Sequence, residues 1–364
     1  MRYFTCGSRT RRRPLLLASM VWLASALAGA ADSRIQVIDR AMIFRHTGTN
    51  FNDPTNTTGF NHAPSIAVLP DGRLLTTWFA APFEGAPQQR IMGSFSSDQG
   101  KTWTAAATLQ DFDGKADFDP SLVVSGQQTF LFFSVTGPLK IFYRSSADSG
   151  RTWAPPVEIG QPNHTTRANG IRLSTGELLV PLHLRGTKAG GVMKSIDGGR
   201  TWTRYGAVAT PKGEGGEPTI AQLKSGKIMM VLRTRDGEVW RSLSSDKGET
   251  WEPPQKTGLT GTSSAAHLLC TRDGTLVLTH NPSREVKRYP LTLRTSQDDG
   301  ATWSEPIVLA DRPTEEGGWS VTYPNGTELS DGTLVVVWTQ IKSSAQEKYG
   351  DIHAARIRLS AGRR

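Results

Sequence analysis

The chain has 364 residues, of which 37% are hydrophobic and 21% are charged, and its 37 Gly and 21 Pro indicate a globular protein with many turns. Its formal charge of +9 falls by five, to about +4, without the arginines of residues 1–30, a segment that contains no acidic residue. Nucleic-acid binding requires clustered positive charge, whereas positively and negatively charged residues are mixed along the rest of the chain. We therefore expect no nucleic-acid partner. The remaining basicity suits an anionic small substrate without requiring one.

Residues 1–30 have the pattern of a secretory signal peptide. Four arginines between positions 9 and 13 precede an apolar run from Leu15 to Ala28, and Ala28-Gly29-Ala30 has the small residues of a cleavage site. The apolar run is shorter than a membrane span. We therefore predict cleavage near Ala30 and export to the periplasm or the cell exterior, with no membrane association afterwards. An uncleaved N-terminal anchor is the alternative, and the arginines leave the export route open.

Beyond residue 30, the pattern Ser-x-Asp-x-Gly-x-x-Trp occurs five times. Its aspartates lie 50, 49, 49 and 52 residues apart, at Asp98, Asp148, Asp197, Asp246 and Asp298. A repeat of about fifty residues predicts a β-propeller made of four-stranded blades. In a tight turn, Asp accepts backbone N–H bonds, Gly adopts a positive φ and Trp packs between blades. We therefore assign these Asp boxes to folding and not to catalysis.

Each repeat also contains a hairpin turn that ends in glycine, at Gly72, Gly126, Gly176, Gly226, Gly274 and Gly332. Six hairpins predict six blades, so we expect residues 31–364 to form an all-β, six-bladed β-propeller with little α-helix. The sixth blade has no Asp box, and its last strand at residues 351–359 leaves the ring open. We therefore predict that an N-terminal strand at residues 35–44 completes this blade as its outer strand.

The innermost strands of a propeller run along its central axis, so the residues just ahead of them converge at one mouth. Counting back from the hairpin glycines places six residues there, namely His62, Asp119, Arg167, Glu217, Ala265 and Tyr323. Polar residues of mixed type favour a pocket at this mouth. A phenol, with an ordinary pKa near ~10, becomes a nucleophile when a carboxylate takes its proton, as Glu217 can for Tyr323. Buried Glu and Tyr side chains also bond to each other without catalysing anything.

The Asp boxes, the six blades and these mouth positions resemble the sialidase (neuraminidase) family of exo-glycosidases, from about Ile35 to the end of the chain. Glu217 followed by Arg233 matches the family's glutamate and second arginine. Arg288 matches its third arginine, and Tyr323 matches its nucleophilic tyrosine. The resemblance implies retaining hydrolysis of a terminal acidic sugar, with a tyrosine nucleophile and with no metal or organic cofactor.

Two positions depart from the family's pattern. The position of the family's acid/base aspartate is matched by Glu84, which keeps a carboxylate but has a longer reach. The first of three arginines that clamp the substrate carboxylate is matched by His62. A guanidinium forms a fixed bidentate fork, whereas an imidazole has fewer donors and a charge that depends on pH. A structural hydrogen bond inside the mouth is the alternative role for His62.

Further candidate substrate-binding residues complete the predicted site. Arg90 and Arg167 are additional cations that can help the two matched arginines to hold a carboxylate, and Asp119 lies at the same mouth by spacing. The histidines are scattered without the spacing of metal ligands, so we infer no metal site.

We therefore expect an exported exo-glycoside hydrolase that acts as a monomer on a terminal sialic acid of a glycan. The departures at His62 and Glu84 leave open a hydrolase for a different acidic sugar, such as a related ulosonic acid. A glycan-binding propeller without catalysis is the third hypothesis. The joint presence of Glu217 and Tyr323 argues against it, because a lectin needs neither a nucleophile nor its base.

Overall fold

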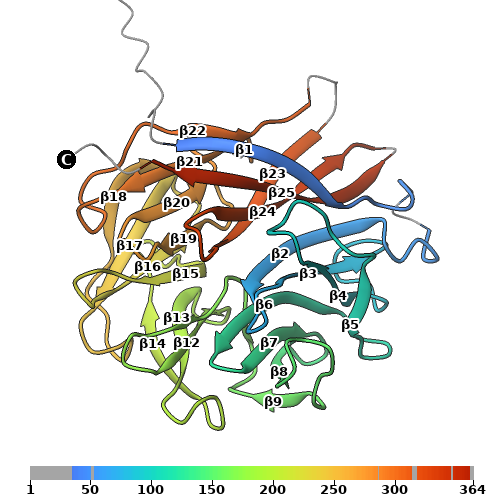
Figure 1. Cartoon of the computed structure of the whole chain (residues 1–364), viewed down its shortest axis with the longest axis horizontal. Helices are drawn as coiled ribbons and strands as arrows, with labels where there is room; N and C mark the ends of the chain where they lie inside the picture. Colours follow the sequence, from blue (N-terminus) through green and yellow to red (C-terminus); the bar gives the residue numbers. More distant parts are fainter. Residues whose placement is uncertain (1–34, 51–52, 286, 314–317, 346, 361–364) are drawn as a thin grey trace, which may run out of the picture. The chain divides into compact units, whose positions relative to one another are not determined.

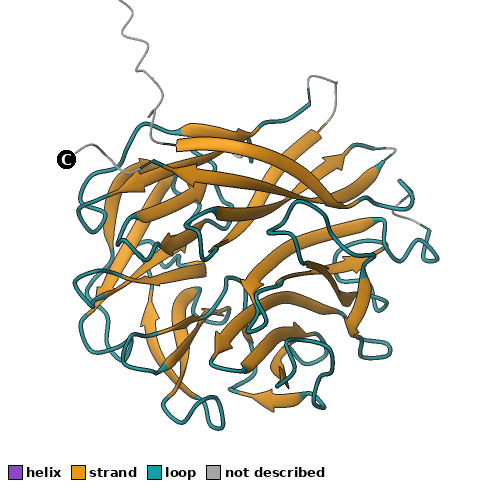
Figure 2. Cartoon of the chain, in the orientation of Figure 1, coloured by secondary structure: helices purple, strands orange, loops and turns teal. Residues whose placement is uncertain are grey.

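The computed structural model describes residues 35–50, 53–285, 287–313, 318–345 and 347–360. The predicted signal peptide at residues 1–30 lies outside them. All regular structure in the described part of the chain is β-strand (Figure 2). Among these residues, no helix has the length and apolar character needed to cross a membrane.

Five sheets are built from strands that follow one another along the chain (Figure 1). In order they contain β2 (Phe60–Val68), β3 (Leu74–Ala81), β4 (Arg90–Ser96) and β5 (Ala107–Gln110); β6 (Asp117–Ser125), β7 (Gln128–Val135), β8 (Lys140–Ser146) and β9 (Val157–Ile159); β10 (His164–Thr165), β11 (Ile171–Arg172), β12 (Leu178–Leu184), β13 (Ala189–Ser195) and β14 (Thr203–Val208); β15 (Gly216–Gln222), β16 (Ile228–Arg233), β17 (Glu238–Ser244) and β18 (Gln255–Thr260); β19 (His267–Cys270), β20 (Leu276–His280), β21 (Leu291–Ser296) and β22 (Ile307–Ala310). In the third sheet, β10 and β11 both pair with β12, so the inner strand of that blade is interrupted.

The sixth sheet joins the two ends of the described chain. It contains β23 (Gly318–Glu328), β24 (Leu334–Ser343), β25 (Lys348–Leu359) and β1 (Ile35–Phe44). β1 pairs antiparallel with β25, with Ile35 opposite Leu359, and Figure 1 shows the two strands side by side. The pairing satisfies backbone groups that β25 would otherwise expose at an edge. The prediction that the N-terminal strand completes the last blade as its outer strand is confirmed.

The six sheets form a closed ring. Their inner strands contact one another in the order β2, β6, β11, β15, β19, β23 and back to β2. The architecture is the predicted six-bladed β-propeller, and one end of its axis collects the starts of the inner strands.

The Asp boxes form the turns that follow the third strands of the blades. In the first box, the backbone N–H and the hydroxyl of Thr102 donate to Asp98 at 2.9 and 2.6 Å, and the hydroxyl of Ser96 donates at 2.8 Å. These bonds lower the pKa of Asp98 to about 2. Trp202 of the third box packs against Phe132 of the second blade, with ring centroids 4.9 Å apart. The boxes therefore stabilise turns and join neighbouring blades.

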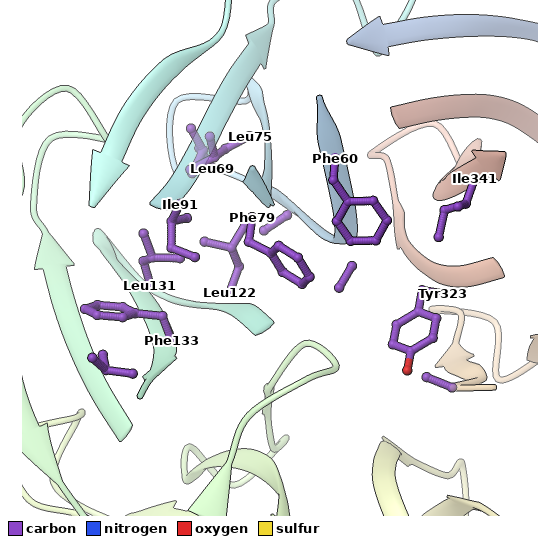
Figure 3. Close-up of a cluster of buried hydrophobic side chains, with 14 residues drawn as sticks. Phe60, Leu69, Leu75, Phe79, Ile91, Leu122, Leu131, Phe133, Tyr323 and Ile341 are labelled. Atoms are coloured by element: carbon purple, nitrogen blue, oxygen red, sulfur yellow. The ribbon is translucent and has the colours of Figure 1, made fainter. Parts of the chain in front are cut away.

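Apolar side chains fill the space between neighbouring blades. One buried cluster, drawn in Figure 3, combines Phe60 and Phe79 of the first blade with Leu122 and Phe133 of the second. All four are at most 2% exposed, and burial of a side chain of this size contributes about 1.5–3 kcal/mol. Tyr323 of the last blade lies at the edge of this cluster, with its hydroxyl directed away from Phe60 (Figure 3).

Candidate active site

Four inner strands, β2, β6, β15 and β23, are bulged where their register shifts. Each bulge contains a residue with positive φ that precedes a proline, namely Ala63 (58°), Asp119 (51°), Glu217 (41°) and Tyr323 (55°). A positive φ is strained for a residue that has a side chain, and such strain gathers at functional sites. A bulge also changes the direction of a side chain relative to its sheet. Three of these four residues are polar, and all three were predicted at the mouth.

Tyr323, Glu217 and Arg233 are in direct contact. Arg233, at the end of β16, donates from Nη1 to the hydroxyl oxygen of Tyr323 at 2.8 Å and from the same nitrogen to a carboxylate oxygen of Glu217. Tyr323 and Glu217 are each 7% exposed. The guanidinium is held from its other side by the hydroxyl oxygen of Ser263, at 3.3 Å from Nε and 3.2 Å from Nη2. The structure thus brings together the predicted nucleophile, its predicted base and one predicted clamp arginine.

The charges in this group determine where the proton resides. Burial opposes ionisation of Glu217, but the positive charges of Arg233 and Arg167 outweigh it and lower the pKa of Glu217 to about 2. Burial and the negative charge of Glu217 raise the pKa of Tyr323 well above its usual value. The carboxylate is therefore ionised and the phenol keeps its proton at neutral pH. A phenol in this state can act as a nucleophile only if its proton is transferred to a base, and Glu217 is the carboxylate nearest to that role.

Three further predicted residues surround the ring of Tyr323. The His62 ring lies 4.2 Å away between centroids. The guanidinium carbons of Arg167 and Arg288 lie 4.7 and 5.5 Å from the ring centroid. The backbone carbonyl of Arg288 accepts a hydrogen bond of 2.8 Å from the backbone N–H of Val321, which ties its loop to β23. The phenol ring is thus enclosed by two cations and one imidazole.

His62 is a buried, neutral imidazole in this setting. It is 4% exposed, and its Nδ1 has no hydrogen-bond partner among the described residues. Burial and the positive charges of Arg167 and Arg288 lower the pKa of His62 well below its ordinary value. The position therefore supplies no fixed positive charge, unlike the arginine that the family pattern places there.

We expect His62 to remain uncharged between about pH 5.5 and 8, a range in which an unperturbed histidine changes its charge. Heteronuclear NMR of ¹⁵N-histidine-labelled protein would follow the imidazole nitrogens, with the His62→Gln variant assigning the signal. A His62 signal that moves to the shifts of an imidazolium near pH 6.5 would contradict the burial and the cationic surroundings described above.

Asp119 is the third polar bulge residue and is 6% exposed. Burial and the negative charge of Glu217 raise the pKa of Asp119 to about 7. Its nearest cation is the Arg185 guanidinium, 4.0 Å from a carboxylate oxygen. Asp119 can therefore exchange a proton near neutral pH, although the hydrogen bonds of the site do not connect it to Tyr323.

Glu84 lies on the exposed loop between β3 and β4. The side chain of Gln89 anchors this loop, because its Oε1 accepts from the Gly85 N–H at 2.7 Å and its Nε2 donates to the Asp117 carbonyl at 3.0 Å. The negative charge of Glu84 contributes to the raised pKa of Asp119, so it acts on the same mouth. Glu84 also lines a pocket of about 370 Å³ with Gln89, Phe118, Leu139 and Arg185.

Arg90, at the start of β4, has other partners. It donates to the Thr57 hydroxyl at 3.1 Å and to the Met92 sulfur at 3.4 Å. Within the described residues, no hydrogen bond or ring contact joins Arg90 to Tyr323. The structure does not bring this predicted cation into the group around the phenol.

A second pocket, of about 320 Å³, adjoins Glu217 and Arg233 on the side of the third and fourth blades. Sequence reasoning missed the residues that build it, which include His183, Arg185, Lys188, Glu214, Arg235 and Ser263. A signal was present, because Arg185 directly follows the second strand of its blade, as Arg233 ends the second strand of the next. Burial and nearby cations lower the pKa of His183 to about 4, so its ring is neutral.

Comparison with known proteins places these features in context. Residues 72–336 match the family model described as BNR repeat-like domain. A sialidase of Bacteroides fragilis is 27% identical over 193 residues, which cover 47% of this chain and 35% of that protein. A sialidase of Micromonospora viridifaciens is 24% identical over 328 residues, which cover 76% of this chain and 49% of that protein. The chain thus spans half or less of the length of these relatives.

Solved structures agree with the architecture. The NanB sialidase of Streptococcus pneumoniae, crystallised with 2-[(3-chlorobenzyl)ammonio]ethanesulfonate, superimposes with a TM-score of 0.73 at 16% identity, covering 88% of this chain and 70% of that one. Likeness at this level of identity establishes the propeller fold.

Proposed function

The chain belongs to the BNR repeat-like domain family, within the sialidase superfamily. From this premise, we propose that it is a glycoside hydrolase that releases a terminal sialic acid, or a related acidic ulosonic sugar, from glycans. The observation that carries the proposal is the contact of Arg233 with both a buried phenol and a buried carboxylate. A binding protein would have no need to enclose this pair among cations.

In the proposed reaction, Arg233 and Arg288 hold the substrate carboxylate. Their guanidinium groups flank Tyr323, so a carboxylate bound between them would present the anomeric carbon to the phenol oxygen. Charge-assisted, bidentate hydrogen bonds make arginine suited to this task. His62, which is neutral, would contact the sugar as an uncharged group.

The first chemical step forms a covalent glycosyl-enzyme. The Tyr323 oxygen attacks the anomeric carbon while its proton moves to Glu217, and the glycosidic carbon–oxygen bond breaks as Glu84 protonates the leaving oxygen. In the second step, Glu84 takes a proton from a water that attacks the same carbon, and the Tyr323 oxygen leaves and recovers its proton from Glu217. Two displacements at one carbon retain its configuration. Tyrosine suits this role because it is neutral, whereas a carboxylate nucleophile would be repelled by the anionic sugar.

Substrate binding would also make Glu217 a stronger base. In the free site, Arg233 gives one N–H nitrogen to Glu217 and Tyr323 together. A substrate carboxylate that engages Arg233 neutralises part of the charge that lowers the pKa of Glu217. The pKa of Glu217 then rises toward its ordinary value, which reduces the energetic cost of accepting the phenol proton.

The polar pocket beside Glu217 suits the hydroxyl-bearing part of such a sugar. Its lining residues include the hydroxyl of Ser263 and the charged groups of Lys188, Glu214 and Arg235. The neutral His62 specifically favours a second candidate, a hydrolase for an acidic sugar other than sialic acid, because the clamp then has two guanidinium groups instead of three. From the pattern of residues 1–30, we also propose that the protein is exported. As a separate proposal, we expect it to act as a monomer.

A panel of fluorogenic α-ketosides tests the proposed function. It contains sialic acid, its deaminated relative and other ulosonic acids, each with a 4-methylumbelliferyl leaving group. The proposal requires hydrolysis of at least one acidic ketoside and no hydrolysis of neutral hexosides. Binding of sialylated glycans without any turnover would instead support the glycan-binding propeller.

We expect Glu84→Gln to lower kcat/KM about 10²-fold for a natural sialoside, because acid catalysis of leaving-group departure is lost. The loss should be much smaller for the 4-methylumbelliferyl ketoside, whose leaving group departs as a stable anion. Steady-state kinetics on both substrates measures this difference, and Glu84→Asp is the matched control that keeps a carboxylate. Equal losses on the two substrates would remove Glu84 from the role of acid.

A further inference from the structure

Arg167 is a buried arginine that lacks a full set of partners. It lies between β10 and β11, where the inner strand of the third blade is interrupted, and it is 1% exposed. Its Nη1 donates to the Pro64 carbonyl of the first blade at 3.4 Å. Its Nε and Nη2 have no hydrogen-bond partner, and no carboxylate lies within 4.0 Å of its guanidinium, among the described residues. An unpaired buried charge is costly, so its presence at this position calls for a functional reason.

The guanidinium of Arg167 faces the phenol ring of Tyr323, 4.7 Å from guanidinium carbon to ring centroid. The two residues come from the third and sixth blades, which lie opposite each other in the ring. Ala63 and Ala265 belong to the same buried cluster as Tyr323 and are at most 2% exposed.

Direct contact between Arg167 and a bound sugar is not compatible with this burial. The more exposed floor of the site is formed by Tyr323 and Glu217, at 7% each. The positive charge of Arg167 nevertheless acts on the reacting groups. Its main negatively charged or ionisable neighbours are Asp119, Tyr323 and Glu217. In a site that excludes water, a fixed charge stabilises a developing opposite charge strongly.

We propose that Arg167 is a positioning residue that holds a positive charge against the ring of Tyr323 and stabilises the negative charge that develops on the phenol oxygen as its proton moves to Glu217. This inference rests on the proposed function. It assigns substrate binding to Arg233 and Arg288 and transition-state stabilisation to Arg167. The other titratable or charged residues that face Tyr323 are Glu217, Asp119, His62, Arg233 and Arg288, and all five are kept when Arg167 alone is replaced.

The test compares Arg167→Met, which keeps the length of the side chain without its charge, with Arg167→Lys. On the acidic ketoside that the wild type cleaves, we expect Arg167→Met to lower kcat about 30-fold while KM changes less than about threefold. Arg167→Lys should recover part of kcat. The acidic limb of the kcat profile should move to higher pH in Arg167→Met, because loss of the cation raises the pKa of Glu217 and Asp119.

Protein stability separates this role from a packing role. Replacing an unpaired buried charge with an apolar side chain of similar length is neutral or stabilising. The thermal unfolding midpoint of Arg167→Met should therefore equal or exceed that of the wild type. A lower midpoint with unchanged kcat and pH profile would identify Arg167 as a structural residue. A KM increase above about tenfold with unchanged kcat would identify it as a substrate ligand. Either result overturns the proposal.

A readout that does not depend on turnover distinguishes failure of this inference from failure of the proposed function. A fluorinated tyrosine incorporated at position 323 has a phenol pKa low enough to be titrated by ultraviolet absorbance. Its pKa should be at least about one unit higher with Arg167→Met than with Arg167. If no ketoside is cleaved but this pKa shift occurs, the proposed function fails and the electrostatic role stands. If the pKa is the same in both proteins, the inference fails regardless of activity.

Discussion

Tyr323→Phe should lower kcat/KM for the cleaved acidic ketoside by about 10³-fold or more, because it removes the oxygen that forms the covalent intermediate in the proposed reaction. The loss of one hydroxyl leaves the aromatic contacts with His62 and the flanking cations in place. Binding of a carboxylate-bearing product should therefore persist. Steady-state kinetics and calorimetric titration with the free sugar measure the two effects separately.

Tyr143→Phe is the matched control, because Tyr143 packs against Phe132 and Trp202 of the second and third blades, away from the mouth. It should retain wild-type turnover. Full turnover by Tyr323→Phe would show that another group attacks the sugar, and loss of both turnover and binding would point to a folding defect instead.

Glu217→Gln should have an effect of similar size, lowering kcat by about 10³-fold. The amide keeps the shape of the side chain but cannot accept the phenol proton. It also leaves Arg233 without its buried anionic partner, so a substrate carboxylate becomes the main anion available to that guanidinium. We therefore expect kcat to fall while KM for the acidic ketoside stays equal or decreases.

Glu214→Gln provides the comparison for this variant. Glu214 lines the pocket beside Glu217, and its carboxylate accepts from the Arg235 backbone N–H at 2.7 Å. The Glu214→Gln change removes one negative charge from the pocket without touching the phenol. Because Glu214 lines the sugar pocket, its loss should act on KM, whereas kcat should change by less than about threefold. Equal losses in the two glutamate variants would indicate a general effect of pocket charge and not base catalysis by Glu217.

The fold was predictable because its determinants are local and repeated. An Asp box closes its own turn through bonds such as those from Thr102 to Asp98, so the sequence pattern alone marks where each third strand ends. The unpaired last strand in turn required a partner, and β1 was the strand available. Neither step depended on knowing how side chains pack at the axis.

The site was predictable only where strand position determines side-chain position. Tyr323 and Glu217 lie on inner strands at equal distances from their hairpin glycines, and the bulges direct both to one mouth. Long side chains outside these bulges follow non-local packing instead. Arg167 reaches the Pro64 carbonyl of the first blade, whereas Arg90 donates to Thr57 on the segment before β2. Sequence spacing carries no information on these directions.

The charge of His62 was also beyond sequence reasoning. Its neutrality results from burial together with nearby cations, chiefly Arg167 of the third blade and Arg288 of the fifth. These cations approach His62 only in the closed ring, because they come from blades that are far apart in the sequence. In the proposed reaction, the clamp therefore has two guanidinium groups instead of three, and selection of the acidic sugar depends in part on uncharged contacts.

The most direct test of the account is to identify the residue that becomes covalently attached to the sugar. A 3-fluoro derivative of the cleaved acidic sugar with a reactive leaving group would slow hydrolysis of the intermediate, and peptide mass spectrometry would locate the adduct. We expect a single adduct on Tyr323 in the wild type and none in Tyr323→Phe. An adduct on Glu217 or Glu84, or turnover with inversion and no adduct, would contradict it.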